Sequence, residues 1–176
     1  MITLREITRD DIPIINRWRQ DPVVSDGVGA PRRFIGPDVD VKWFEDYLTR
    51  RGSEVRCAVC LAESGTLVGM VSLTRIDYVH RNAEYNAVVG ERDSQNRGVG
   101  TAATRAMIRH GFFDLNLHRI YVAILCENIS SIRMCEKAGF RREGTIREGA
   151  YKNGTYHDLV LMGVLKSEVR ALEGGR

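Results

Sequence analysis

The chain has 176 residues, 43% of them hydrophobic and 28% charged, and a formal net charge of +3. This composition is that of a globular protein with a core of its own, and the charge permits an anionic ligand but is too small to indicate nucleic acid. No apolar run approaches the about 20 residues that span a bilayer, and the N-terminus lacks the basic start and apolar block of a signal peptide. We therefore expect a single domain over residues 1–170, a flexible tail over 171–176, no membrane contact and a cytoplasmic location.

The first half of the chain predicts two helices among four strands. Ile12, Ile15 and Trp18 recur at helical spacing after two acidic residues and predict a helix that ends at Asp21-Pro22. Residues 25–40 are rich in Gly, Pro, Arg and Asp without a period, so we expect a loop there, and a loop this long is often functional. The other elements expected in this half are a strand over 2–7, a helix over 41–50, and strands over 56–61, 67–76 and 81–89.

The second half predicts two helices and three strands. The expected elements are a helix over 101–114, a strand over 119–125, a helix over 129–138 and a hairpin with strands over 141–148 and 156–165. Asn153-Gly154 is a strong hairpin-turn signal, and the strand–turn–helix–strand unit over 83–125 predicts a right-handed parallel crossover. The fold class is therefore α/β (mixed α+β), with a central mixed, mostly antiparallel sheet of about seven strands and helices on both faces.

The run Gln95-Asn96-Arg97-Gly98-Val99-Gly100 stands at a strand-to-helix junction of this expected fold. Glycines there allow a tight turn and a close approach to a ligand, and the free N–H groups at a helix start favour anions. The run therefore predicts a pyrophosphate-binding turn. Residues 98–103 also fit the G-x-G-x-x-A fingerprint of dinucleotide-binding domains. The context argues against that alternative, because such a domain needs several successive βαβ units and this chain offers one.

Several motifs in the same order carry a resemblance to a known family. Gln95-x-x-Gly98-x-Gly100 resembles the Q/R-x-x-G-x-G/A motif of the GNAT superfamily of acetyl-CoA-dependent N-acetyltransferases. Residues 127–140, ENISSIRMCEKAGF, are similar to its E-N-x-x-A-x-x-x-Y-E-K-x-G-F segment. Residues 144–148 and 156–162 resemble the closing hairpin of the branch that holds ribosomal-protein N-terminal, spermidine and amino-sugar acetyltransferases. The resemblance implies a GNAT-like sheet, splayed between its fourth and fifth strands.

The resemblance also implies acetyl-CoA as co-substrate and a set of residues that bind it. The turn would hold the pyrophosphate through main-chain N–H groups, and the strand before it would pair with the pantetheine arm as an added strand does. Asn128 would contact the cofactor, although Asn is also a good helix N-cap. The expected cofactor-binding residues are Ala87, Val88, Val89, Gln95, Asn96, Arg97, Gly98, Val99, Gly100, Thr101, Asn128 and Ser131.

Two residues are candidates for proton transfer. Glu84 is the expected general base, acting through a water on an ammonium that is mostly protonated at neutral pH. Cys135 falls where the family has the tyrosine that acts as general acid. A thiol can in principle protonate the leaving thiolate, but cysteine is also a common buried hydrophobe. Tyr151, Tyr156 or a water could substitute, so the proton donor stays open.

The acceptor is expected to be a primary amine of a small molecule. Five acidic residues would supply negative charge suited to a polyamine, an amino sugar or an aminoglycoside: Asp38, Asp40, Glu45, Asp46 and Glu84. A protein N-terminus is the alternative acceptor, and a non-catalytic acetyl-CoA sensor is the alternative of another class. No metal is expected, because Cys57 and Cys60 would face opposite sides of a strand. A homodimer is expected by analogy with the family.

Overall fold

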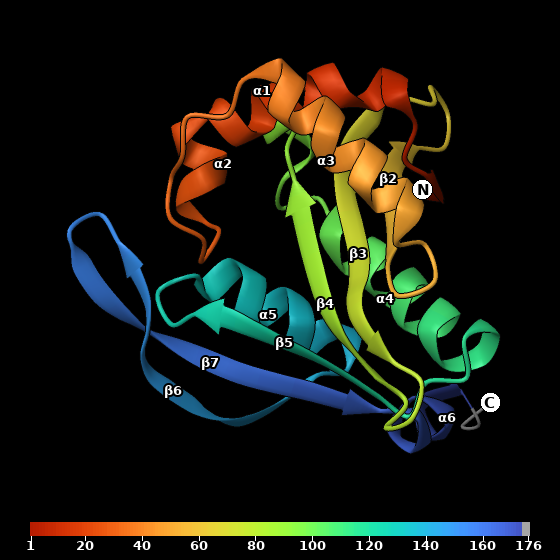
Figure 1. Ribbon diagram of the computed structural model, residues 1–176. Helices are drawn as coiled ribbons and strands as arrows, with labels where there is room; N and C mark the ends of the chain where they lie inside the picture. The colour runs from red at the N-terminus through yellow and green to blue at the C-terminus, as the bar shows by residue number, and fades with distance from the viewer. Residues whose placement is uncertain (174–176) are drawn as a thin grey trace.

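A computed structural model describes residues 1–173 and shows one seven-stranded sheet (Figure 1). The strands are β1 (Ile2–Glu6), β2 (Val55–Leu61), β3 (Leu67–Asp77), β4 (Asn82–Val89), β5 (Arg119–Leu125), β6 (Arg141–Lys152) and β7 (Thr155–Leu165). Their order across the sheet is β1-β2-β3-β4-β5-β7-β6, and every neighbouring pair is antiparallel except the parallel pair β4–β5. The predicted mixed, mostly antiparallel sheet is confirmed.

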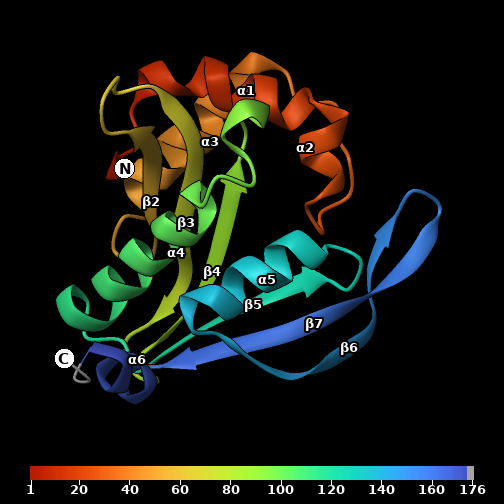
Figure 2. The ribbon, with the colours of Figure 1, turned by 180° about the vertical axis from the view of Figure 1, so that it is seen from behind.

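Helices cover both faces of this sheet. They are α1 (Ile12–Gln20), α2 (Pro22–Asp26), α3 (Pro37–Thr49), α4 (Val99–Arg109), α5 (Ile129–Ala138) and α6 (Lys166–Glu173), with short turns at Arg9–Asp11, Arg92–Ser94 and His110–Asp114. The helices α1 and α3 lie on one face, and α4 and α5 on the other, as the views from the front and from behind show (Figures 1 and 2). Within residues 1–173, no helix combines the length and the apolar character needed to cross a bilayer.

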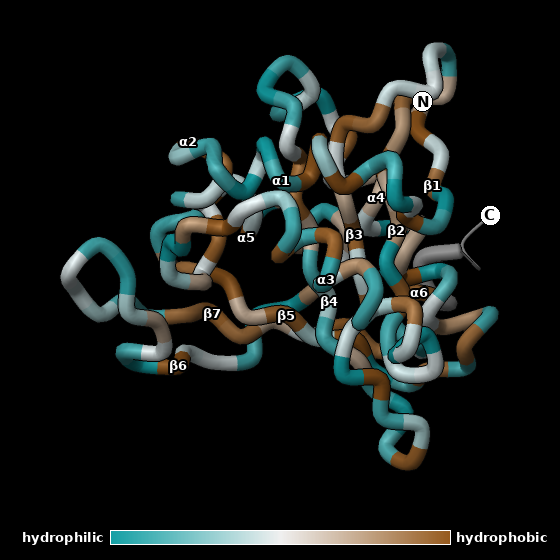
Figure 3. Tube along the Cα trace, turned by 45° about the horizontal axis from the view of Figure 1, so that its top comes forward, coloured by the Kyte–Doolittle hydropathy of each residue, from teal (hydrophilic) through white to brown (hydrophobic). Residues whose placement is uncertain are grey.

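Two hydrophobic cores result, one on each face. Leu73 of β3 and Tyr85 of β4 are at most 1% exposed and pack with α4 and α5, whereas Trp18 and Tyr47 pack with the other face. The strand period of two explains the division, because successive side chains of β3 alternate between the two cores. In Figure 3, hydrophobic colour runs along β5 and β7, while the edge strand β6 is mostly polar. The cores therefore hold the centre of the sheet and leave β6 largely exposed.

The parallel pair β4–β5 opens soon after it forms. Only three residue pairs join the two strands, and the last of them is Glu84 with Tyr121. Beyond that point β4 continues to pair with β3 as far as Val89, and β5 continues with β7 as far as Leu125. Figure 1 shows β4 and β5 diverging from their paired ends. The splay expected between the fourth and fifth strands is therefore confirmed, with Glu84 at its vertex.

Several expected boundaries were wrong. The predicted loop 25–40 contains the last residues of α2 and the first turn of α3, which begins at Pro37 rather than 41. Asp21-Pro22 ends α1 as expected, but Pro22 also starts α2 at the first helical position, where proline is favoured. The strand β6 runs on to Lys152 instead of ending at 148, through two irregularities in its pairing with β7. Of the predicted tail, residues 171–173 continue α6, and 174–176 lie outside the described residues.

Candidate functional site

A cavity of about 570 Å³ lies between the open end of β4, the start of α4, the helix α5 and the α2 segment. Most of the residues expected to bind cofactor meet in it. Ten of them line the cavity: Ala87, Val88, Val89, Gln95, Asn96, Gly98, Gly100, Thr101, Asn128 and Ser131. They come from three elements that are separate in the sequence, so the fold brings them together as the resemblance implied. Their contact with a cofactor stays a prediction.

Two expected residues lie outside the cavity lining. Val99 is the first residue of α4, and its side chain is 8% exposed because it packs into the core beneath the turn. Arg97 lies on the exposed outer side of the turn. Their contact with a cofactor also stays a prediction.

The turn before α4 is set by left-handed backbone at two positions. Asn96 has φ +58° and Gly98 has φ +81°, and Gly98 is the residue that caps α4. The Gln95 side-chain amide donates to the Val89 carbonyl oxygen at 2.9 Å, which ties the turn to the end of β4. The cap makes no side-chain hydrogen bond, so the first N–H groups of α4 are left for a ligand at the positive end of the helix dipole.

The two glycines of the turn are needed for different reasons. A Cβ on Gly98 would meet nothing within 4 Å, so glycine serves there because the left-handed conformation disfavours other residues. A Cβ on Gly100 would lie 2.6 Å from the Met134 sulfur of α5. Gly100 therefore leaves room for the Met134 side chain at the contact of α4 with α5.

Asn128 links α5 to the α2 segment. Its side-chain oxygen accepts from the Ser131 backbone N–H at 3.1 Å and so caps α5, while its amide nitrogen donates to the Gly27 carbonyl at 2.7 Å. The capping role weighed as the alternative is therefore present, although the side chain also borders the cavity. A contact between Asn128 and a cofactor remains untested.

Sequence reasoning missed one wall of the cavity and two of its charges. The wall consists of residues of α2 and the segment after it: Val23, Val24, Gly27 and Val28. Asp21 positions this wall, because it accepts from the Val23 N–H and pairs with Arg92, next to the turn, at 2.8 Å. Arg133 and Lys137 of α5 also line the cavity. Their spacing of four on a helix that begins at the cavity is a signal that could have found them.

A buried ammonium group holds the α2 segment from the other side. Lys152, at the end of β6, is 4% exposed, and its Nζ donates to the carbonyl oxygens of Ser25 (2.5 Å), Asp26 (3.1 Å) and Val28 (2.7 Å). Burial lowers the pKa of this lysine. Together, Lys152 and Asn128 bind four consecutive carbonyls and fasten the segment to the hairpin and to α5.

Glu84, the candidate base, lies on β4 where this strand separates from β5. Glu84 shares a face of β4 with Val88, which packs against the α1–α3 core, and its carboxylate is 23% exposed. The Arg75 Nε lies 3.4 Å from its Oε2. Glu84 is not among the residues that line the cavity, but it occupies the vertex at which β4 and β5 separate. Its proton-transfer role stays a prediction.

The other proton-transfer candidate is buried. Cys135 is 1% exposed on the core side of α5, and burial raises the pKa of its thiol to about 12. It is also absent from the lining of the cavity. The structure therefore does not bring Cys135 together with the ten lining residues.

The acidic set expected at the acceptor site is largely neutralised, which corrects the charge argument. Asp40 is fully buried, bonded by Asn16 at 2.6 Å and paired with Arg19. The ion pairs on the surface are Glu45 with Arg9 (2.9 Å), Asp46 with Lys42 (2.9 Å) and Glu84 with Arg75 (3.4 Å). Charge counted along the sequence overstated the negative field, because it could not see these partners. Asp38 and Glu45 are the exposed members of the set.

Comparisons with known proteins agree with this geometry. Residues 1–141 match the family model described as an acetyltransferase (GNAT) domain. A putative ribosomal N-acetyltransferase of Bacillus subtilis, YdaF, is 36% identical over 137 residues, which cover 78% of this chain and 70% of the relative. The spermidine N(1)-acetyltransferase of Vibrio cholerae is 33% identical over 58% of each chain.

A solved structure extends the likeness to the whole fold. The spermidine N-acetyltransferase from Vibrio cholerae in complex with CoA and spermine superposes with a TM-score of 0.87 at 27% identity. The superposition covers 95% of this chain and 96% of that one. With the family model matching most of its length, the chain belongs to the GNAT acetyltransferase family.

Proposed function

We propose that the protein transfers an acetyl group from acetyl-CoA to a primary amine of a small molecule. The observation that carries this proposal is the convergence of ten expected cofactor residues on one cavity, beside strands that splay at Glu84. A related structure with CoA and spermine supports both the cofactor and a small amine acceptor. The homodimeric state expected from the family resemblance and the cytoplasmic location expected from the composition are part of this proposal.

The cavity fits the anionic part of acetyl-CoA. Free N–H groups at the start of α4 bind the pyrophosphate, and Arg133 and Lys137 on α5 add positive charge for the phosphates. Beside them, Ala87, Val88 and Val89 border the cavity on the part of β4 that has separated from β5. Backbone groups there pair with the amide arm of the cofactor as with an added strand.

Transfer requires a neutral amine and a donor for the acyl oxygen. Glu84, at the vertex of the splay, first takes one proton of the acceptor ammonium through a water. The neutral amine nitrogen then bonds to the thioester carbon of acetyl-CoA, the carbon–sulfur bond breaks, and the thiolate leaves as the thiol of CoA with the second proton that the nitrogen gives up. A backbone N–H of β4 in the gap donates to the acyl oxygen as negative charge develops, an interaction worth roughly 3 kcal/mol at comparable sites.

Cys135 remains the candidate in the position of the family's proton donor. Its thiol stays protonated at neutral pH, because burial raises its pKa to about 12, but it does not border the cavity. We expect Cys135→Ala to lower the melting temperature, since a buried side chain is shortened, and to leave kcat close to the wild-type value. A large fall in kcat at an unchanged KM would instead establish the thiol as donor.

The test of the proposed function is thiol release from acetyl-CoA by the purified protein. The acceptor panel holds polyamines, amino sugars, aminoglycosides and peptides with free N-termini, and mass spectrometry identifies the acetylated product. We expect amine-dependent release with at least one small acceptor. Transfer to peptides alone would establish the ribosomal-protein type of activity, and tight acetyl-CoA binding without release on any amine would establish a sensor. Saturable binding of NADH without binding of acetyl-CoA would restore the dinucleotide alternative.

A further inference from the structure

A β-bulge next to the vertex of the splay carries an arginine. Between the pairs made by Thr74 and Asp77, the strand β3 places two residues, Arg75 and Ile76, opposite the single residue Ala83 of β4. Arg75 has φ +51°, in the left-handed region that is unfavourable for a residue with a Cβ. Bulges of this kind re-aim a side chain and are frequent next to active sites.

The bulge exchanges the faces of two side chains. In a regular strand, residue 75 would point into the core with Leu73, and residue 76 would point outward with Thr74. The structure has the opposite arrangement, because Ile76 is 7% exposed in the core and the Arg75 side chain is 78% exposed. The left-handed backbone thus directs the Arg75 guanidinium to the face of the sheet opposite to Leu73. Strained backbone of this kind is frequently tied to function.

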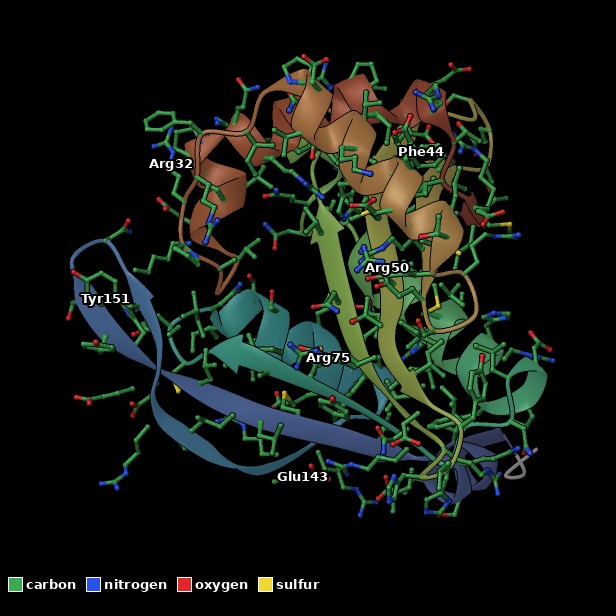
Figure 4. All side chains as sticks on the ribbon, in the orientation of Figure 1. Arg32, Phe44, Arg50, Arg75, Glu143 and Tyr151 are labelled. Carbon is green, nitrogen blue, oxygen red and sulfur yellow. The ribbon has the colours of Figure 1, made fainter. Side chains whose placement is uncertain are left out.

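The guanidinium group lies against the candidate base. Its Nε is 3.4 Å from the Glu84 carboxylate, and Figure 4 shows Arg75 in the opening between β4 and β5. An ion pair this exposed contributes little to stability, so the pair itself does not account for the strained backbone. Arginine carries five N–H donors in a planar fork that suits carboxylate and phosphate oxygens, and one contact with Glu84 uses a small part of that capacity.

Three of the other acids expected at the acceptor site are already paired. Asp40, Glu45 and Asp46 are each engaged by a basic residue of the α1–α3 layer or of the segment before it. The Glu84 carboxylate and the Arg75 guanidinium thus lie side by side at the vertex. A zwitterionic acceptor matches this pair, since its ammonium meets Glu84 while its anionic group meets Arg75.

We propose that Arg75 binds an anionic group of the acceptor beside the amine that Glu84 deprotonates. The acceptor is then a small amine that bears a carboxylate or phosphate within a few atoms of its nitrogen, rather than a polyamine. This inference rests on the proposed acetyl transfer and specifies the substrate class of the same site. The separation of 3.4 Å between the two side chains requires the two acceptor groups to be close neighbours.

The experiment compares acceptors that differ only in the anion. One arm pairs each proteinogenic amino acid with its carboxamide, a second pairs glucosamine 1-phosphate with glucosamine, and spermidine is the polycation. We expect kcat/KM to favour the anionic member of at least one pair by roughly tenfold to a hundredfold, the range of a hydrogen bond between charged groups. The two arms distinguish a carboxylate from a phosphate.

Variants assign the preference to Arg75. Arg75→Gln should abolish it through KM for the acceptor at an unchanged KM for acetyl-CoA, and Arg75→Glu should favour spermidine. Arg75→Gly removes the guanidinium and relieves the left-handed strain, so it should lose the preference without a lower melting temperature. Arg81→Gly is the matched control: Arg81 has φ +55° but its guanidinium binds Asn116, so this variant should keep the preference.

Each failure has its own signature. Absence of transfer to every amine would overturn the proposed function itself. Transfer without any preference for anionic acceptors, a preference for spermidine, or transfer to peptides alone would overturn the inference and leave the acetyltransferase activity standing. A preference that survives Arg75→Gln in full would show that another group binds the anion and would overturn the assignment.

Discussion

The cofactor side and the acceptor side of the splayed sheet are built in different ways. The proposed pyrophosphate turn is made mainly of backbone: a left-handed turn, the free start of α4 and the open end of β4, all within residues 87–101. The proposed acceptor side depends on two side chains, Arg75 on the bulge of β3 and Glu84 at the vertex on β4. The proposed cofactor contacts therefore follow from local backbone, while the proposed acceptor contacts depend on which way the bulge turns a side chain.

The largest effect should come from the acceptor side. Glu84→Gln removes the proposed base, and we expect kcat to fall about a hundredfold or more while KM for acetyl-CoA stays unchanged. Steady-state kinetics at saturating acceptor measure kcat and KM for acetyl-CoA separately. Glu143→Gln is the control, because Glu143 is likewise a strand carboxylate paired with an arginine, Arg119, and lies on the edge strand β6. If both variants keep wild-type turnover, proton transfer does not pass through Glu84.

The next effect should come from the turn on the cofactor side. Gly98→Val places a β-branched residue at φ +81°, so the turn has to change and the N–H groups of α4 lose their alignment. We expect KM for acetyl-CoA to rise about tenfold or more, since a conformational cost of 1–2 kcal/mol is of that size. Isothermal titration with CoA checks the affinity directly.

A second substitution at Gly98 separates the effect of the backbone conformation from the effect of side-chain size. Asparagine tolerates the left-handed conformation, so Gly98→Asn keeps the turn and adds a side chain beside the cavity. A mild effect of asparagine and a strong effect of valine would show that the backbone conformation matters most. Equal affinity for CoA in both variants and the wild type would contradict the proposed pyrophosphate site.

A smaller effect is expected from Lys152, which fastens the α2 segment to the β6–β7 hairpin. Lys152→Met leaves three carbonyls of the α2 segment without their buried donor, and we expect about 2 kcal/mol of lost stability, or roughly 4–8 °C in melting temperature. KM for acetyl-CoA should rise a few-fold, because Gly27 and Val28 border the cavity. Lys42→Met is the control, since that side chain is 71% exposed in a surface ion pair. Equal melting temperatures for both variants would show that the buried bonds contribute nothing.

The contrast between the two sides also explains what could be predicted from the sequence. The turn at Gln95–Thr101 was predicted because its chemistry is local: glycine, a strand before it and a helix after it. The bulge was not, because Leu73-Thr74-Arg75-Ile76 reads as an ordinary strand, and packing of Ile76 in the core decides which side chain turns outward. The negative charge of the acidic set was overestimated for the same reason, since partners such as Arg19 come from elsewhere in the fold. The α2 wall of the cavity was not predicted, because Pro22 was interpreted as the end of one helix and not also as the first residue of the next.

The smallest predicted effect concerns His157, whose ring contacts the backbone carbonyl of Lys152. The His157 Nδ1 lies 3.0 Å from a Glu127 carboxylate oxygen and its Nε2 lies 3.1 Å from the Lys152 carbonyl oxygen. Two acceptors call for two donors, which is the protonated ring. The hydrogen bond to Glu127 accordingly raises the pKa of His157. This contribution to stability is complete below the unfolded pKa of about 6.5 and is lost as the pH rises through the higher folded value.

The pH dependence of melting tests this contact. The melting temperature of His157→Gln should lie furthest below that of the wild type near pH 5.5, and the gap should narrow by pH 8.5. In a Glu127→Gln background the same substitution should cost less and vary less with pH, because the partner that raises the pKa is gone. A gap that stays constant from pH 5.5 to 8.5 would mean that the imidazole ring contributes to stability by packing and not by its charge.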